Sequence, residues 1–383
     1  MRDYAQRLHG LGTTIFAEMS DLAIRTNSVN LGQGFPDTDG PDSLLEAAVA
    51  AIRSGANQYP PSRGIPALRQ AIVEHQQRFY GFEYDPDSQV LVTTGATEAI
   101  AAALLAYVEP GDEVIALEPY YDSYAACIAM AGGYRVPVTL RAPAFRLDLD
   151  ELRAAVTDRT TVLLINSPHN PTGTVLTDAE LRGIAEVAVE HDLVVITDEV
   201  YEHLVFDSAQ HIPLASYEGM AERTVSIGSA GKTFSVTGWK IGWVTGSPEV
   251  VTAVNTAKQF LTYVSGAPFQ PAVAGALALG NDYFESFRDT LQGKRDRLCD
   301  GLERLGFGVH RPEGTYFVTT DVRPLGYEDG VEFCRMLPEK VGVVAIPHQV
   351  FYDNVDLGRP LVRWAFCKQD HILDEALARL TKL

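Results

Sequence analysis

The stretch Leu193-Val-Val-Ile-Thr-Asp-Glu-Val-Tyr201 decides the fold class of this chain. Its first five residues are apolar or β-branched, which is typical of a strand buried on both faces of a parallel sheet. A helical pattern over 177–191 comes directly before it, with Thr177 and Glu180 placed to form a capping box. A helix that leads into a fully buried strand indicates one unit of a helix-covered α/β sheet.

Similar units lie on both sides of this stretch, from about residue 42 to 280. The other β-rich runs are 89–93, 114–117, 136–140, 161–165, 224–227 and 241–245. Helical patterns lie between most of them, including 42–55, 64–79 and 97–107. We therefore predict an α/β fold with a mainly parallel seven-stranded sheet between helices.

The pattern changes after about residue 282. A long charged helix over 284–305 leads to strands near 316–320, 343–346 and 361–366, and then to a final helix. A chain of 383 residues exceeds what one core usually serves. We predict an N-terminal arm with part of a small domain over 1–41, a large domain over 42–281 and a small α+β domain over 282–383.

The composition narrows the class of protein. The chain is 46% hydrophobic and 21% charged, with a net charge of −19, which argues against a nucleic-acid partner. The most apolar stretch, Ala99–Val108, is too short to cross a bilayer. The four cysteines of the chain are scattered and form no Cys-x-x-Cys pair. This pattern predicts reduced thiols with packing roles and a cytoplasmic location. The cysteines are Cys127, Cys299, Cys334 and Cys367.

Two nucleotide-binding motifs are incomplete in this sequence. Gly231-Lys232-Thr233 resembles the end of a phosphate-binding loop, but Ser226 stands where that motif needs its first glycine. The Gly32-x-Gly34 pair lacks the third glycine of a dinucleotide fingerprint. A nucleotide-binding protein similar to the P-loop proteins therefore stays a remote alternative.

The same region suits a pyridine aldehyde cofactor, which needs a lysine amine and a carboxylate facing the ring nitrogen. Asp198 ends its apolar run, at the edge of the sheet where ligands bind, and Tyr201 can donate to a ring oxygen. Lys232 follows another strand in a loop of small residues. Taken alone, Asp198 fits a helix or turn cap equally well, and a lone lysine is usually solvated.

The elements of a phosphate and ring site are also present. Thr94-Gly-Ala-Thr97 joins a strand to a helix, so free backbone N–H groups would face an anion, with Lys240 and Ser229 as side-chain partners. Tyr120 and Tyr121 follow another strand, where they can stack on an aromatic ring. A simple turn and core packing are the commoner roles of such residues.

Together these blocks closely resemble the class I aminotransferases of pyridoxal phosphate (PLP) fold type I. The similarity is greatest to the kynurenine, glutamine, methionine and N-succinyldiaminopimelate aminotransferases. The matching blocks are Asn30-Leu-Gly-Gln-Gly-Phe-Pro-Asp37, Asn57-Gln-Tyr59, Asn166-Ser-Pro-His-Asn-Pro-Thr-Gly173, Asp198-Glu-Val-Tyr201, Ser229-Ala-Gly-Lys-Thr-Phe-Ser-Val-Thr-Gly-Trp-Lys240 and Glu313-Gly-Thr-Tyr316.

The resemblance implies a cofactor site. Lys232 would form the Schiff base, and Asp198 would face the pyridine nitrogen. Asn170 and Tyr201 would bind the ring hydroxyl, and Tyr121 would stack on the ring. The phosphate would be held by Ala96, Thr97, Ser229 and Lys240.

The resemblance also implies a shared site in a homodimer and a substrate clamp. Tyr59 would reach the phosphate of the neighbouring subunit. Arg363 would grip the substrate α-carboxylate, a bidentate task that suits a guanidinium, with Gly34 and Asn170 beside it. Phe16 and Tyr263 would face the substrate side chain.

The implied reaction is the ping-pong transfer of an amino group from an L-amino acid to a 2-oxo acid, with Lys232 moving the α-proton. Phe16 stands where kynurenine-active relatives tend to carry tryptophan, and Val264 where some carry histidine. Methionine, glutamine, aromatic and N-succinyldiaminopimelate substrates stay open, and Arg63 is a candidate partner for a distal carboxylate. A cysteine-conjugate β-lyase and a PLP-sensing regulatory module are the alternatives.

Overall fold

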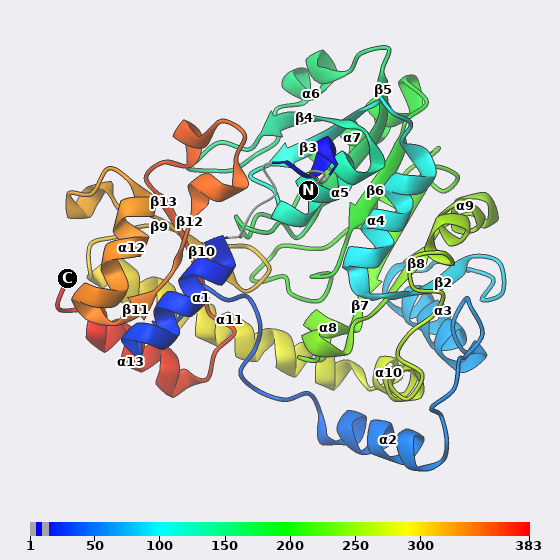
Figure 1. Cartoon of the computed structure of the whole chain (residues 1–383), viewed down its shortest axis with the longest axis horizontal. Helices are drawn as coiled ribbons and strands as arrows, with labels where there is room; N and C mark the ends of the chain where they lie inside the picture. Colours follow the sequence, from blue (N-terminus) through cyan, green and yellow to red (C-terminus); the bar gives the residue numbers. More distant parts are fainter. Residues whose placement is uncertain (1–4, 10–14) are drawn as a thin grey trace.

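The computed structural model describes residues 5–9 and 15–383, and its largest element is a seven-stranded sheet (Figure 1). The strand order is β2-β8-β7-β6-β5-β3-β4, and only β8 runs antiparallel to its neighbours. The strands are β2 (Val90–Thr94), β3 (Glu113–Glu118), β4 (Tyr134–Thr139), β5 (Thr160–Asn166), β6 (Val194–Asp198), β7 (Thr224–Ser229) and β8 (Ile241–Thr245). The predicted mainly parallel sheet is confirmed.

Helices bury both faces of this sheet because successive strand residues point to opposite sides. In β5, Val162 and Leu164 pack under α4 (Gly95–Tyr107), α5 (Asp122–Ala131) and α9 (Pro248–Lys258). Leu163 and Ile165 pack under α6 (Leu149–Ala155) and α7 (Asp178–Glu190). The capping box of Thr177 and Glu180 opens α7 as expected.

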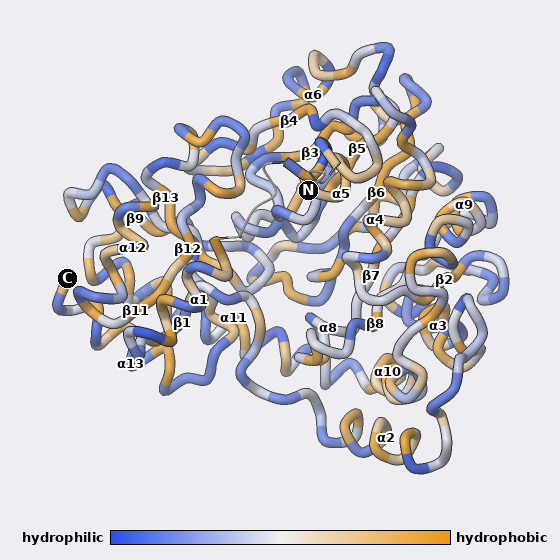
Figure 2. Tube along the Cα trace, viewed as in Figure 1, coloured by the Kyte–Doolittle hydropathy of each residue, from blue (hydrophilic) through white to orange (hydrophobic). Residues whose placement is uncertain are grey.

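A third cluster covers β2 and β8 with α2 (Asp42–Arg53), α3 (Pro66–Tyr80) and α10 (Phe269–Leu277). In Figure 2 hydrophobic and hydrophilic residues alternate along the turns of α2, as expected for a helix with one buried face. Its buried residues, Leu44, Ala48 and Ala51, recur at helical spacing. These helices extend the large core beyond the last parallel strand.

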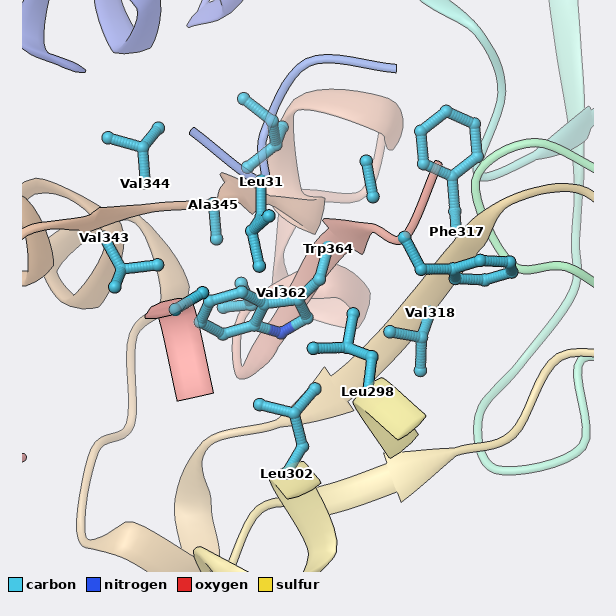
Figure 3. Close-up of a cluster of buried hydrophobic side chains, with 14 of the residues drawn as sticks. Leu31, Leu298, Leu302, Phe317, Val318, Val343, Val344, Ala345, Val362 and Trp364 are labelled. Atoms are coloured by element: carbon cyan, nitrogen blue, oxygen red, sulfur yellow. The ribbon is translucent and has the colours of Figure 1, made fainter. Parts of the chain in front are cut away.

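The C-terminal part is built on a four-stranded sheet of order β12-β13-β10-β9. Its strands are β9 (Gly308–His310), β10 (Phe317–Asp321), β12 (Ile346–Pro347) and β13 (Leu361–Ala365). A parallel pair, β1 (Val29–Asn30) with β11 (Val343–Val344), lies beside it. The helices are α1 (Ile15–Thr26), α11 (Asn281–Arg304), α12 (Gly330–Val341) and α13 (Asp370–Leu380). Trp364 fills this core against Leu298 and Leu302 (Figure 3).

Helix α11 joins the two parts, because Phe284 at its start packs in the α3 and α10 cluster and Leu298 in the C-terminal core. In Figure 1 it runs from α10 toward α12. The predicted limits at 41/42 and 281/282 stay a prediction, and part of the 1–41 arm lies outside the described residues. Within the described residues, no helix is long and apolar enough to span a membrane. All four cysteines are free and buried.

Candidate active site

A cavity of about 500 Å³ lies between the carboxyl edge of the large sheet and strands β10 and β13. Its walls contain most of the residues that the sequence singled out. These are Phe16, Gly34, Ala96, Thr97, Tyr121, Asn170, Asp198, Tyr201, Ser229, Lys232, Lys240 and Arg363. The fold therefore brings together residues that are up to 347 positions apart, from Phe16 to Arg363.

Lys232 lies in α8 (Ala230–Thr233), a short helix that directly follows β7. The Ser229 side chain caps this helix by accepting from Gly231 N. Lys232 Nζ donates to Tyr316 Oη at 3.0 Å, and that hydroxyl donates to Gly34 O at 2.6 Å. Burial lowers the pKa of Lys232 to about 8. This lowering makes far more of the amine unprotonated at neutral pH than in an exposed lysine, and the unprotonated form is the nucleophile toward an aldehyde.

Asp198 is the last residue of β6 and is buried. Tyr124 Oη donates to its Oδ2 at 2.5 Å, and Asn166 Nδ2 donates to its backbone oxygen at 2.8 Å. Burial raises the pKa of Asp198, whereas the hydrogen bonds from Tyr124 and Val200 lower it. A buried carboxyl held in this way can face a protonated ring nitrogen.

The opposite end of the cavity suits an anion. Ala96 and Thr97 lie in the first turn of α4, whose N-cap residue Thr94 makes no side-chain cap, so helix N–H groups and the helix dipole face the cavity. Lys240 Nζ lies 3.4 Å from Thr97 Oγ1. A Cβ on Gly242 would come within 2.6 Å of the Gly95 backbone, so only glycine lets β8 approach this turn.

Three polar residues line the wall between these ends. Tyr121 lies at the N-cap of α5 with its ring edge to face with Tyr124 at 5.7 Å. Asn170 is held through its backbone N–H, which donates to Asn166 Oδ1 at 2.7 Å. The Tyr201 ring meets Tyr316 edge to face at 5.3 Å, and burial raises its pKa. Each can contact a flat ring between the acid and the anion site.

Arg363 lies in the middle of β13 and reaches the cavity from the C-terminal part. Its guanidinium donates to Asn170 Oδ1 at 3.0 Å and Gly32 O at 3.1 Å. It lies 4.0 Å from the ring centre of Phe317 and 5.2 Å from that of Phe16. Burial lowers its pKa to about 10, so it stays charged at neutral pH. A buried guanidinium whose partners are neutral oxygens is suited to bind a carboxylate.

Two predicted residues do not line the cavity of their own chain. The side chains of Tyr59 and Tyr263 are 82% and 46% exposed, and their rings meet edge to face at 5.6 Å. Their expected contacts with phosphate and substrate are therefore not made within the described chain. Arg63 also points away, because its Nη1 donates to Asp87 O at 2.9 Å. Within its own chain Arg63 therefore holds a loop, and its contact with a distal carboxylate stays a prediction.

Sequence reasoning missed several residues of the site. Asn166 pairs with Asp198 in the register of β5 and β6, so the parallel sheet could have revealed it. Tyr124 follows Tyr121 by one helical turn, which was also a usable signal. Tyr316 and Phe317 come from the C-terminal part; Tyr316 ends one of the matching blocks, but nothing in the sequence indicated that it contacts Lys232 or that Phe317 contacts Arg363.

The residues fit PLP. The cavity offers a helix N-terminus with Lys240 for a phosphate, Asp198 for a pyridine nitrogen and Lys232 for an aldehyde carbon. Arg363 Nε is buried without a hydrogen-bond partner in the described part of the chain, so this wall leaves room for a further acceptor. The arrangement can carry proton transfer at the α-carbon of an amino acid that Arg363 holds by its carboxylate.

Comparisons with known proteins, by sequence and by structure, all match aminotransferases. Residues 26–380 match the model for aminotransferase class I and II. A probable N-succinyldiaminopimelate aminotransferase from Mycobacterium tuberculosis is 57% identical over 387 residues, covering 98% of each chain. A methionine aminotransferase from Escherichia coli is 40% identical, covering 98% of this chain and 97% of the other. The solved structure of the Mycobacterium tuberculosis N-succinyldiaminopimelate aminotransferase superposes with a TM-score of 0.97, covering 99% of each chain.

Proposed function

The chain belongs to the class I and II aminotransferases, and on that premise we propose how it performs transamination in this cavity. PLP would be held by Lys232 at its aldehyde carbon, by Asp198 at its ring nitrogen and by Tyr121 on its face. Asn170 and Tyr201 would bind the ring hydroxyl. The phosphate partners would be Ala96, Thr97, Ser229 and Lys240. When bound, this cofactor supplies an electron sink for charge that develops on the substrate α-carbon.

The chain's own residues would move the proton and hold the substrate. Lys232 Nζ, once freed by the substrate amine, would take the α-proton as a general base. It would then return this proton at the cofactor's aldehyde-derived carbon. Its lowered pKa, caused mainly by burial, suits both directions near neutral pH. Tyr316 Oη, at 3.0 Å from Nζ, would orient the amine. The reaction is the transfer of an amino group between an L-amino acid and a 2-oxo acid in two half-reactions.

Arg363 would hold the substrate α-carboxylate. The hydrogen bonds that the guanidinium donates to Asn170 Oδ1 and Gly32 O hold its plane between aromatic rings, where water is largely excluded. Gly34 would lie against the same carboxylate, and a Cβ there would come within 2.4 Å of Phe317. Phe16 would border the substrate side chain. With the carboxylate held by Arg363 and the side chain beside Phe16, the α-hydrogen of the substrate would face Lys232.

The active enzyme would be a homodimer with shared sites. The rings of Tyr59 and Tyr263, 82% and 46% exposed, pack edge to face at 5.6 Å, and Phe260, close to Tyr263 in sequence, is 84% exposed. Exposed aromatics gathered in this way are typical of protein interfaces. Tyr59 would reach the partner's phosphate site and Tyr263 the partner's substrate. A cytoplasmic location is part of the same proposal and rests on the free cysteines.

We propose an N-succinyldiaminopimelate-type substrate. The observation that carries this choice is the 57% identity over 98% of each chain to a probable N-succinyldiaminopimelate aminotransferase. The methionine aminotransferase is the main rival, at 40% identity. Phe16 would give the substrate side chain one apolar border, and Gln33 and Asp122 also line this cavity. A polar distal group would be met by these side chains, by the partner subunit or by solvent.

The test is a single half-reaction followed by absorbance. The PLP-loaded enzyme is mixed with N-succinyl-LL-diaminopimelate, methionine, glutamine or kynurenine, with no oxo acid present. We expect the band of the bound cofactor to convert to that of its amine form, with the largest kcat/KM for the succinylated substrate. Faster conversion by methionine would contradict the substrate proposal. Pyruvate and ammonia release from a cysteine conjugate would show elimination in place of transfer.

A further inference from the structure

A second cluster of metal-ligating side chains lies outside the cavity described above. His75 comes from α3, and Glu202 and His203 come from the loop that follows β6. One ligand atom from each residue lies within 4.8 Å of the others. His75 and Glu202 are 2% and 6% exposed. Helix and loop therefore bring two imidazoles and one carboxylate to one buried point.

The polar atoms of this cluster are incompletely satisfied. His75 Nε2 and His203 Nε2 lie 2.7 Å apart, so only one of the two can donate to the other. Glu202 Oε2 is buried and has no hydrogen-bond partner in the described part of the chain. A buried carboxylate oxygen without a partner costs stability unless another group satisfies it. His211 Nδ1, in the same neighbourhood, is a second buried atom without a described partner.

Aromatic side chains close this point off from water. The Phe79 ring lies 4.8 Å from that of His75 and 4.7 Å from that of His203. The Phe284 ring lies 4.5 Å from that of His203. The charged or titratable groups that face the cluster from outside are Arg78, Glu199 and His211. Glu202 also has side-chain hydrogen bonds with Tyr80 and Gln76. Arg78 Nη1 donates a hydrogen bond to Leu279 O, and the guanidinium carbon lies 4.9 Å from the ring centre of Phe79. A dry shell of this kind strengthens each ligand bond to a cation.

We propose that His75, Glu202 and His203 bind a divalent transition-metal ion, with zinc the best match. Two imidazole nitrogens and one carboxylate oxygen are a donor set for zinc and its neighbours, whereas calcium and magnesium require oxygen ligands. Metal–nitrogen bonds of about 2.0–2.1 Å in a tetrahedral site would separate the two Nε2 atoms by roughly 3.3 Å. The two Nε2 atoms, now 2.7 Å apart, therefore have to separate by about 0.6 Å.

A metal at this point would link two parts of the large domain. Helix α3 would be tied to the loop that follows Asp198, the last residue of β6, and that carries Tyr201 near its start. The ion would act on stability and on the position of that loop, and no metal ligand touches the reacting atoms. Binding is therefore expected to raise the melting temperature while leaving the chemistry to Lys232.

The test uses the PLP-loaded enzyme, freed of metal with a chelator and dialysed. Zinc is titrated by calorimetry, and cobalt is titrated by absorbance as a probe of tetrahedral coordination. We expect one ion per chain, a cobalt spectrum typical of tetrahedral nitrogen and oxygen ligands, and a higher melting temperature with zinc. No stoichiometric binding at micromolar ion would overturn the proposal and leave ordered water as the partner of Glu202.

Variants locate the ion. Glu202→Gln and His75→Phe keep the size of the side chains, and we expect each to bind zinc more than about 100-fold more weakly, since even loss of an outer partner costs about 10–100-fold. The matched control is His191→Gln, at the exposed end of α7. Unchanged affinity in Glu202→Gln and His75→Phe would overturn the site, and so would a loss in His191→Gln.

Discussion

The two walls of the cavity are built differently. On the large-sheet wall, Asp198 and Lys232 each lie within three residues of a strand end. On the C-terminal wall, Arg363 lies in the middle of β13 and is buried among aromatic rings. The first wall is made by the edge of one sheet. The second is made by a packed core that has to be complete before the guanidinium is in place.

This difference separates two tasks. The edge of a parallel sheet collects polar groups at strand ends, because loops there are free to approach a ligand. A charged group inside a strand needs fixed partners to stay buried, and Arg363 obtains them from Asn170 and Gly32. We therefore expect changes on the large-sheet wall to stop the chemistry, and changes on the C-terminal wall to weaken substrate binding.

The largest expected effect is that of Lys232→Ala. Loss of the amine removes both the covalent attachment and the proton carrier, so kcat should fall by at least about 10⁴-fold. Phosphate contacts remain, so PLP should still bind, without the absorbance shift of the attached form. The measurement is steady-state turnover together with spectra. Activity within about tenfold of the wild type would contradict the assignment and remove the contrast between the walls.

Arg363→Lys should have the next largest effect. The ammonium keeps the charge but loses the two-pronged geometry, so kcat/KM should fall by about 10- to 100-fold, the size of a hydrogen bond to a charged group. Most of this loss should appear in KM, since the lysine at position 232 is untouched. A fall confined to kcat would contradict the proposal that the C-terminal wall serves substrate binding and the large-sheet wall the chemistry. Substrate titrations of each half-reaction distinguish the two outcomes.

Tyr124→Phe sharpens the comparison within the large-sheet wall. It removes the 2.5 Å hydrogen bond to Asp198 Oδ2, which lowers the pKa of that carboxyl. The pKa of Asp198 should rise, and kcat should fall by about tenfold with its acid limb moved to higher pH. The matched control is Tyr120→Phe, which removes a phenol bond to Asp353 away from the cavity. Equal kcat losses in both variants would point to a general effect on folding.

The smallest expected effect is a shift in the pKa of Lys232, on the large-sheet wall, caused by the charge of Arg363 on the C-terminal wall. The pKa of Lys232 is lowered to about 8, mainly by burial and to a smaller extent by the charge of Arg363. The reactive amine is the unprotonated form, so capture of PLP by the cofactor-free enzyme should speed up with pH and level off above about 8. In Arg363→Gln the midpoint should move to higher pH. A midpoint unchanged in that variant would show that the walls act independently.

The sheet and the cofactor wall could be predicted from local patterns. Apolar runs gave the strands to within about two residues, and Asp198 and Lys232 stood out because each follows such a run. Helix starts shifted as well: α3 begins at Pro66, where the fixed φ of proline suits the first helical turn, and not at Gly64. The C-terminal wall was reached only through the family resemblance, because nothing near Arg363 in sequence identifies its partners.

The sequence by itself determined the alternation of buried strands and helices, and with it the edge where Lys232 and Asp198 meet. Hydrophobic periodicity is local, so it can be read along the chain. Only the tertiary structure decided which side chains surround them. It brought Tyr316 to Lys232, Tyr124 to Asp198 and Phe317 to Arg363. Those contacts depend on how whole elements pack, and packing is a property of the complete core.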